Sequence, residues 1–445
     1  MSDEEKKKKA TLVSTGNRGL ATRSSGLAKR GLELLSSHQE RTIYFPTDRS
    51  IGVLYVLGED NKWIRIDARG KVTIPIGRTL GFHDGSNYFT GGFRHALSAR
   101  RSGKPRIYDS DLICLQELAE LQWLYLTGLQ ITDAGLVHLQ GMTTLKKLYL
   151  TDTNISDAGL VHLKELRDLE LLNVGGFNEM TDAGLVHLSG LTKLKKLDMG
   201  LSFGDTNFSD AGLAHLQRLT ELESLHLSGT QITDAGLVYL GDKTKLKVLS
   251  LFPTKITDAG LVQIKGLTNL EGLWLPQSQI TDAGLVHLQG MNRLKQLSFG
   301  DTKISDAGLA NIQKLIELDV LDLTRTQITD AGLVYLEGMT KLKTLLLKNT
   351  NIRGAGLAHL QGLTDLEKIN LSETQISDIE LTYLKSFSKL NKLELESTQV
   401  SNAGLFHLQK LANLNFLNPK NTKVTEAGVA ALKRALPNCK IDWRS

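Results

Sequence analysis

The chain has 445 residues, of which 41% are apolar and 23% charged, with a formal net charge of +5 and two cysteines. This composition is ample for a hydrophobic core. It contains no run of 18 apolar residues and no amino-terminal apolar segment like a signal peptide, so we expect a soluble cytoplasmic protein.

Residues 1–40 begin MSDEEKKKKA and are otherwise rich in Gly, Ser, Thr and Arg, which predicts a flexible tail with room for a short helix over 27–35. Residues 1–108 hold 20 Lys and Arg against 10 Asp and Glu, a net charge of +10. The remainder holds 33 against 38, a net charge of −5. The simplest interpretation is a solubilising tail, and the alternative is a contact with nucleic acid or an acidic partner.

Residues 41–106 change to alternating and β-branched runs: TIYF, IGVLYV, KWIRI and KVTIPI, separated by turn residues. This pattern predicts a small β-rich unit. Because a repeat array needs its first hydrophobic layer covered, we interpret the unit as an N-terminal cap, with an independent binding module as the alternative.

From residue 107 to the end the chain repeats a phrase of about 24 residues, clearest as ITDAGLVHLQGMTTLKKLYL over 131–150. Its marker is the glycine of Asp-Ala-Gly-Leu. Glu380 and Asp111 occupy the glycine slot in two units. The spacing is 24 except for 25 after Gly159 and 28 after Gly184. A period in the twenties predicts a solenoid, here of about 14 repeats over 107–445.

Each unit combines two apolar periods. Leu145, Leu148 and Leu150 suit a short strand, and the stretch from Ile131 to Met142 has the spacing of a short helix capped by Thr132. Because strands stack about 4.8 Å apart and helices about 8–10 Å apart, the array must curve with its parallel sheet on the concave face. The recurrent glycine predicts a close approach between neighbouring helices.

A column of threonines stands three residues after the last strand leucine of most units. Buried hydroxyls there would satisfy backbone groups freed by the turn. The members of the column are Thr153, Thr206, Thr230, Thr254, Thr302, Thr326, Thr350, Thr374, Thr398 and Thr422.

The LxxLxL strands and Thr-Asp-Ala-Gly-Leu segments over 107–445 resemble leucine-rich repeat proteins, most closely a bacterial subclass, and are similar to the cysteine-containing repeats of F-box proteins. In the closing LPNCKIDW, Leu436, Cys439 and Ile441 take the slots of a last strand. The resemblance implies an α/β horseshoe. Threonine stands where the family usually has a turn asparagine. Cys114 and Cys439 fall at opposite ends of the array, so a disulfide between them is not expected.

The residue between the last two strand leucines must point out of the concave sheet. This position varies while the frame repeats, which is typical of a binding surface, and exposed aromatic residues are typical interface anchors. The alternative is that scattered exposed aromatics are ordinary. The residues predicted to bind a partner, which include flanking and loop positions, are Trp123, Tyr125, Tyr149, Phe177, Phe203, His226, Phe252 and Trp274.

Phe177 and Phe203 lie in the two insertions, GGFNEM and GLSFGDTN, which lengthen adjacent strand-exit loops. The second insertion also contains a G-x-S-x-G match around Ser202, near Asp198 and His226. A serine hydrolase would use such a set, but the next helix begins too late for a nucleophile elbow and no oxyanion donor pair is evident.

Seven histidines follow marker glycines at a spacing of three, from His138 to His407. Helices about 8–10 Å apart cannot share one zinc ion through this column. No phosphate-binding loop and no CxxC pair is present, so we expect no metal, no cofactor and no catalytic residues.

The sequence therefore predicts a non-enzymatic, monomeric scaffold that binds a protein partner through its concave face and strand-exit loops. Resemblance to F-box repeat proteins implies an alternative, the substrate-recognition subunit of a ubiquitin ligase, although residues 1–106 show no F-box helical pattern. The Ser202 hydrolase is the remote third candidate.

Overall fold

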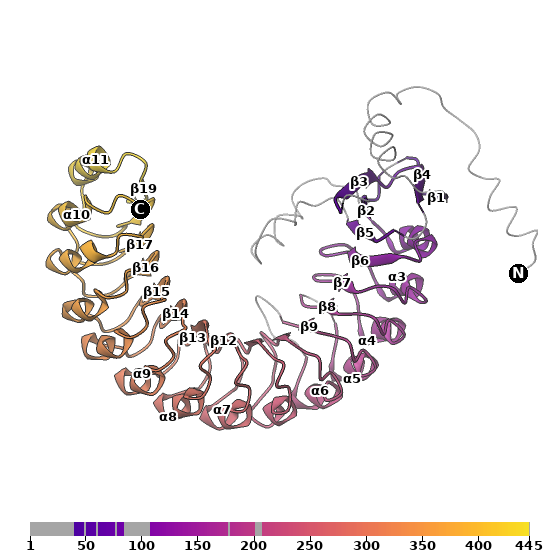
Figure 1. Cartoon of the computed structure of the whole chain (residues 1–445), viewed down its shortest axis with the longest axis horizontal. Helices are drawn as coiled ribbons and strands as arrows, with labels where there is room; N and C mark the ends of the chain where they lie inside the picture. Colours follow the sequence, from indigo (N-terminus) through magenta and orange to yellow (C-terminus); the bar gives the residue numbers. More distant parts are fainter. Residues whose placement is uncertain are drawn as a thin grey trace, which may run out of the picture.

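The computed structural model describes residues 40–48, 50–58, 61–75, 78–83, 107–176, 179–200 and 207–444. These residues form an open curved array with strands along the inner rim and helices along the outer rim (Figure 1). The predicted helix over 27–35 lies outside the described residues, as does the tail up to residue 39. The predicted α/β solenoid is confirmed.

Five strands build the N-terminal unit: β1 (Glu40–Tyr44), β2 (Val53–Leu57), β3 (Trp63–Asp67), β4 (Lys71–Pro75) and β5 (Leu80–His83). β1 and β4 form an antiparallel ribbon, and β2 pairs antiparallel with both β3 and β5. β5 then pairs in parallel with the first strand of the repeats, so one sheet runs from the N-terminal unit into the solenoid. Apolar side chains of both parts form one continuous core. The boundaries at residues 40 and 106 remain predictions.

The repeats contribute parallel strands that align one unit with the next. The sheet is open, with β3 at one end and β19 at the other. The strands are β6 (Leu121–Tyr125), β7 (Lys147–Tyr149), β8 (Leu171–Asn173), β9 (Lys196–Asp198), β10 (Ser224–His226), β11 (Val248–Ser250), β12 (Gly272–Trp274), β13 (Gln296–Ser298), β14 (Val320–Asp322), β15 (Thr344–Leu346), β16 (Lys368–Asn370), β17 (Lys392–Glu394), β18 (Phe416–Asn418) and β19 (Lys440–Ile441).

The outer rim is made of short helices, in several units an α turn followed by a 3-10 turn. The α-helices are α3 (Asp133–Leu136), α4 (Asp157–Leu160), α5 (Asp182–Leu185), α6 (Asp210–His215), α7 (Asp258–Ile264), α8 (Asp282–Leu285), α9 (Asp306–Ile312), α10 (Asn402–Leu408) and α11 (Glu426–Ala435). The 3-10 helices are η3 (Asp109–Glu117), η4 (Val137–Leu139), η5 (Val161–Leu163), η6 (Val186–Leu188), η7 (Gly236–Leu240), η8 (Val286–Leu288), η9 (Asp330–Leu336), η10 (Ala355–Leu360) and η11 (Ile379–Ser386).

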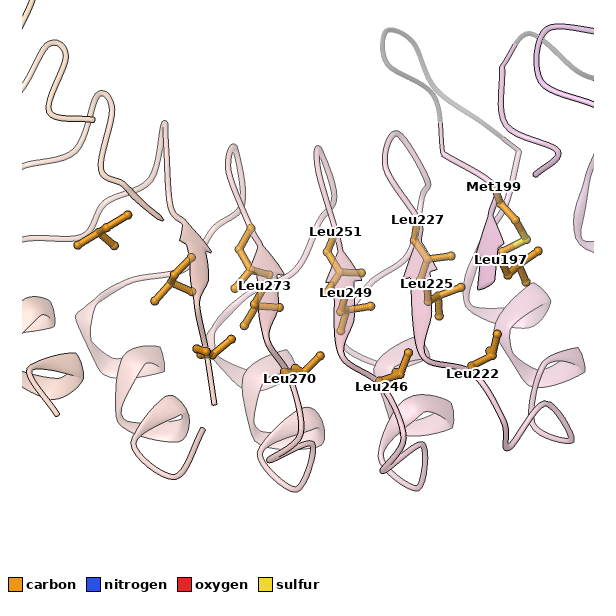
Figure 2. Close-up of a cluster of buried hydrophobic side chains, with 14 of the residues drawn as sticks. Leu197, Met199, Leu222, Leu225, Leu227, Leu246, Leu249, Leu251, Leu270 and Leu273 are labelled. Atoms are coloured by element: carbon orange, nitrogen blue, oxygen red, sulfur yellow. The ribbon is translucent and has the colours of Figure 1, made fainter. Parts of the chain in front are cut away.

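The core consists of stacked leucine rows. Figure 2 shows buried side chains such as Leu246, Leu249 and Leu251 aligned with their equivalents in the neighbouring repeats. All three are fully buried. Because each repeat covers its apolar face only with its neighbours, the array is stable as a stack rather than unit by unit.

The hydroxyl groups of the threonine column donate hydrogen bonds to backbone carbonyls at the turn, as predicted. Thr254 Oγ1 donates to the carbonyl of Leu251 over 3.0 Å, and Thr153 Oγ1 donates to that of Leu150 over 2.6 Å. Both hydroxyl groups are buried. The equivalent threonines of other repeats repeat the bond, whereas Thr206 lies outside the described residues.

In most repeats the first-turn aspartate joins the repeat to the next one. The Asp133 carboxylate accepts the backbone N–H of Ser156 over 2.8 Å and the Ser156 hydroxyl over 2.5 Å. We call this pair of bonds the inter-repeat clamp. It recurs between Asp109–Thr132, Asp157–Thr181, Asp182–Ser209, Asp210–Thr233, Asp234–Thr257, Asp258–Thr281, Asp282–Ser305, Asp306–Thr329 and Asp378–Ser401.

The clamp explains the marker glycine, which lies where neighbouring helices approach closely, as predicted. A Cβ at Gly159 would lie 2.3 Å from Oδ1 of Asp133. The position is therefore restricted by the carboxylate of the preceding repeat.

Both residues that replace the marker glycine, Glu380 and Asp111, accept hydrogen bonds within their own repeat. Gly354 leaves Ser377 without an aspartate in the preceding repeat, and Glu380 of the same repeat accepts the Ser377 N–H and hydroxyl over 2.9 and 2.7 Å. A Cβ at Gly354 would lie 2.1 Å from Cγ of Glu380, so the two substitutions fit only together. In the first unit, Asp111 likewise accepts the N–H of Tyr108 over 2.9 Å.

Candidate partner-binding face

The predicted concave row exists as one line of residues across the sheet. The strand registers place Tyr125 beside Tyr149, and the row continues in chain order as far as Asn418. Between them lie Asn173, Asp198, His226, Ser250, Trp274, Ser298, Asp322, Leu346, Asn370 and Glu394. Every member alternates with a buried strand residue, which explains why the row could be predicted from a period of two.

The N-terminal unit extends this face. Tyr55 on β2 and Trp123 on β6 both register with Gly81 on β5, which lies between them. A Cβ at Gly81 would lie 1.7 Å from the Trp123 ring, so the ring occupies the space that a side chain on β5 would need. Trp123 is only 8% exposed, because the N-terminal unit covers it. It forms the base of this region rather than the exposed anchor that the sequence predicts.

Five rings gather where the N-terminal unit meets the first two repeats, and we call Tyr55, Trp63, Trp123, Tyr125 and Tyr149 the aromatic cluster. The Trp123 ring lies 5.2 Å from Tyr55, 5.6 Å from Trp63 and 5.8 Å from Tyr125 between centroids. Tyr125 and Tyr149 stack at 3.9 Å. Trp63 is 44% exposed and forms the outer wall.

Two members of the cluster were missed from the sequence. Tyr55 and Trp63 lie in the N-terminal unit, whose alternation predicts strands but not how those strands join the repeat sheet. Their distance along the chain from Trp123 gives no signal of contact. Within the cluster, burial and then the hydrogen bond with Tyr149 raise the pKa of Tyr125, so its hydroxyl stays protonated at neutral pH.

The middle of the row is a polar network. Thr151 Oγ1 donates to Asn173 Oδ1 over 2.6 Å, and Asn173 Nδ2 donates to Asp198 Oδ2 over 3.0 Å. The N–H of Gly200 donates to the other Asp198 oxygen over 3.1 Å. Burial raises the pKa of Asp198, against the opposing influence of His226. Burial also lowers the pKa of His226 below its ordinary value.

Trp274 forms a second aromatic site near the centre of the array. A Cβ at Gly272 would lie 2.5 Å from the Trp274 ring, so the ring lies across the glycine on its own strand. The rings of His226 and Trp274 are 6.5 Å apart and inclined by 27°, with the small Ser250 between them in the register. Phe252, in the flanking row, is half-buried.

The C-terminal end of the face is charged and internally paired. Lys348 pairs with Glu373 at 3.0 Å, and Lys420 pairs with Asp442 at 3.1 Å. Lys392 pairs with Glu394 at 2.9 Å and lies 4.9 Å over the ring of Phe416. A partner docking here would have to compete with these contacts, whereas the aromatic cluster offers apolar surface directly.

The two predicted loop anchors, Phe177 and Phe203, lie outside the described residues, and so does Ser202. Among the described residues, a serine that contacts His226 is Ser224, whose Oγ lies 3.2 Å from His226 Nε2. The bonds from Asn173 and Gly200 to the Asp198 carboxylate orient it as part of a polar network. This arrangement can donate and accept hydrogen bonds toward a ligand on the concave face.

The predicted column of histidines lies on the outer rim. His162 Nδ1 is 2.7 Å from the Gln140 amide, and His359 Nδ1 is 2.6 Å from Glu337. Over the residues that the structure describes, no three His, Cys, Asp or Glu side chains gather as a metal site would require. Within the same residues, no helix has the length and apolarity needed to cross a bilayer.

Comparisons with known proteins point to one family. Models described as leucine rich repeat match residues 316–376, 141–164 and 219–241. No curated protein matches the chain. A solved internalin (inlF) of Listeria monocytogenes is 24% identical, covering 78% of this chain and 92% of that chain, with a TM-score of 0.49. A leucine-rich repeat protein of Leptospira interrogans is 19% identical, covering 74% of this chain and 86% of that chain, with a TM-score of 0.54, which supports the fold.

Proposed function

The chain is a leucine-rich repeat protein, and we propose that its function is to bind a protein partner on its concave face. The aromatic cluster is the observation that carries this proposal. Tyr and Trp dominate the binding energy of protein interfaces because they bury large apolar area at low entropic cost. Five such rings on one end of a curved face form a ready anchor site.

The polar centre and Trp274 fit the same function. Asn173, Asp198 and His226 are preorganised by their mutual contacts and can contribute specificity without further ordering. The two insertions that contain Phe177 and Phe203 follow β8 and β9, the strands that carry Asn173 and Asp198. We include them in the proposed surface as strand-exit loops.

Affinity capture from the source cell tests this function. Wild-type protein is compared with Tyr149→Ala/Trp274→Ala, with Trp63→Ala/Tyr149→Ala and with a deletion of residues 201–205. Phe406→Ala is the matched control, because Phe406 is an aromatic residue that is 67% exposed on the outer rim. We expect both concave double variants to lose the partner that Phe406→Ala retains. If all variants recover the same partners, the concave face is not the recognition surface.

We further propose that residues 41–106 cap the array of about 14 repeats over 107–445, and that the protein is a cytoplasmic monomer. The continuous core supports the cap, and the two free cysteines suit a reducing compartment. Light scattering tests the oligomeric state, and cell fractionation tests the location. Removing residues 41–106 should expose the apolar side of the first repeat and cause aggregation.

A further inference from the structure

We propose that the segment of the partner that docks on the aromatic cluster is an acidic peptide with apolar anchor residues. This inference rests on the proposed function and specifies the chemistry of the partner. It follows from three cations that interleave with the rings, from the charge distribution of the chain and from the orientation of the rings.

One row of the concave face contains both rings and cations. Arg65 registers with Tyr55, whose other neighbour across the sheet is Gly81, and Gly81 registers with Trp123. Trp123 registers with Lys147, and the row reaches Lys196 two strands later. Tyr55 and Trp123 therefore lie between Arg65 and Lys147 in this row, and Trp63 and Tyr149 are on the same strands as Arg65 and Lys147.

The three cations are available to a ligand. Arg65, Lys147 and Lys196 are exposed. In the described part of the chain, none of their side chains forms a hydrogen bond or an ion pair. Exposed charges of this kind keep their hydration at little cost and attract an opposite charge over about 8–10 Å at physiological salt.

Several lysines along the strands and on the concave face are paired, in contrast to these three cations. Beside the strands, lysines pair with an acid one repeat earlier: Lys195–Glu170, Lys247–Glu223 and Lys295–Glu271. At the other end of the concave face, Lys348, Lys392 and Lys420 are each paired as well. The aromatic cluster thus has three unpaired cations beside it, whereas at the other end of the same row Lys440 is the exposed lysine without an ion pair among the described residues.

Three acids lie near these cations, and each has another partner. Glu223 forms its ion pair with Lys247, and that bond, with a smaller contribution from Lys196, lowers the pKa of Glu223. Asp67 accepts a hydrogen bond from the Ser50 hydroxyl at the outer edge. Asp198 is held within the polar network by Asn173 and Gly200. The N-terminal unit adds a contribution of the same sign, because the described residues between 40 and 83 carry six Lys and Arg against three Asp and Glu. Such an imbalance steers an acidic partner toward this end of the molecule.

The ring geometry favours a peptide over single-stranded nucleic acid. Nucleobases bind by stacking on open ring faces. The faces of Tyr125 and Tyr149 are turned toward each other, at 3.9 Å with an interplanar angle of 10°. Trp123 is 8% exposed and offers no open face. Trp63, which is 44% exposed, and the accessible ring edges remain for a ligand, and these suit the apolar side chains of a peptide.

Phage-displayed random peptides, selected on the full-length protein, test the inference. The wild type is compared with the charge-reversal variant Arg65→Glu/Lys147→Glu/Lys196→Glu. The matched control is Lys348→Glu/Lys392→Glu/Lys420→Glu, which makes the same change in net charge at the other end of the same face. A ring variant, Trp63→Ala/Tyr149→Ala, and competition by oligo(dT) complete the set, and thermal melts check that every variant is folded.

We expect peptides rich in Asp and Glu with aromatic or aliphatic residues. The affinity of these peptides for the charge-reversal variant should be at least about tenfold lower than for the wild type, and added NaCl should also lower the affinity for the wild type by at least about tenfold. In the control variant the affinity should fall by less than about twofold. Selected peptides without an acidic bias, or equal losses in both charge variants, would overturn the inference. If peptides without an acidic bias still require Trp63 and Tyr149 for binding, the proposed function stands and only the inference of an acidic peptide fails. If no selected peptide depends on those rings, the proposed function fails too. Tighter binding of oligo(dT) at the same residues would identify a nucleic-acid site instead.

Discussion

The outer rim and the inner rim of this solenoid use the same repeat in opposite ways. On the outer rim almost every unit makes the same two contacts with its neighbour, as in the Asp133–Ser156 clamp. On the inner rim, residues in equivalent positions differ from unit to unit, from Tyr125 through Asp198 to Glu394. The contrast teaches that contacts between repeats restrict one surface and leave the other free to vary for recognition. Changes on the outer rim should therefore alter stability, and changes on the inner rim should alter binding.

The marker glycine gives the largest expected effect on the outer rim. In Gly260→Ala the new Cβ would lie 2.4 Å from Asp234 Oδ1 and would displace the clamp to Thr257. We expect a loss of about 2–4 kcal/mol in the free energy of unfolding, because two hydrogen bonds to a carboxylate are lost. Urea denaturation of Gly260→Ala and the wild type measures this difference in the free energy of unfolding.

Gly290→Ala is the control for this change. No atom lies within 4 Å of a Cβ at Gly290, so the variant should be neutral or slightly stabilising. Equal losses in the two variants would mean that the carboxylate does not restrict the glycine slot.

The paired exception sharpens the comparison. Glu380→Gly removes the acid that accepts from Ser377 and should cost about 1–2 kcal/mol. Arg353→Thr/Gly354→Asp alone should also destabilise, because the new aspartate collides with Glu380 and because Gly354 has a φ of +115°, which glycine favours. The combined variant restores the common repeat and should recover most of the loss. Additive losses in a double-mutant cycle would contradict the coupling between the two sites.

The turn column gives a smaller effect. In Thr254→Val the carbonyl of Leu251 loses its hydroxyl donor, and we expect a loss of about 1 kcal/mol despite the apolar gain. Differential scanning calorimetry compares it with Thr143→Val, which changes an exposed threonine. An equal or raised melting temperature for Thr254→Val would show that the buried hydroxyl does not stabilise the turn.

The smallest expected effect is a pH dependence at the inner rim. Burial holds the pKa of His226 below its ordinary value of 6.5, so the unfolded chain binds more protons than the folded one as the pH falls through that value. His226 should therefore reduce stability on acidification. Asp198 acts in the opposite sense at lower pH, because burial raises its pKa and the folded state takes up its proton first.

Urea midpoints at about pH 7.5 and about pH 5.5 test this prediction. The decrease should be smaller in His226→Gln than in the wild type, and His287→Gln on the outer rim should behave as the wild type does. An unchanged decrease in His226→Gln would contradict the assigned role of burial.

The repeat frame could be predicted from the sequence because its signals are local and recur. Leu145, Leu148 and Leu150 define the strand and its inward side, and Thr132 marks the helix start. The inter-repeat clamp could not be predicted, because the first-turn Asp133 already has a local explanation at a helix N-terminus. Only the structure shows that its carboxylate reaches the next repeat.

The aromatic cluster was predicted in part. Tyr125 and Tyr149 follow from the strand register, but Tyr55 and Trp63 depend on how β2 and β3 join the repeat sheet through β5. That junction relies on Gly81, where the missing side chain admits the Trp123 ring. No periodic pattern encodes it. The ubiquitin-ligase alternative and the Ser202 hydrolase remain predictions.

The most direct test of recognition by the inner rim measures partner affinity and melting temperature together. Trp63→Ala/Tyr149→Ala should weaken binding of the captured partner by at least about thirtyfold, about 2 kcal/mol, with little change in melting temperature. Gly260→Ala should lower the melting temperature and leave the affinity of the folded protein close to that of the wild type. Wild-type affinity in Trp63→Ala/Tyr149→Ala, with the fold intact, would contradict recognition through the concave face.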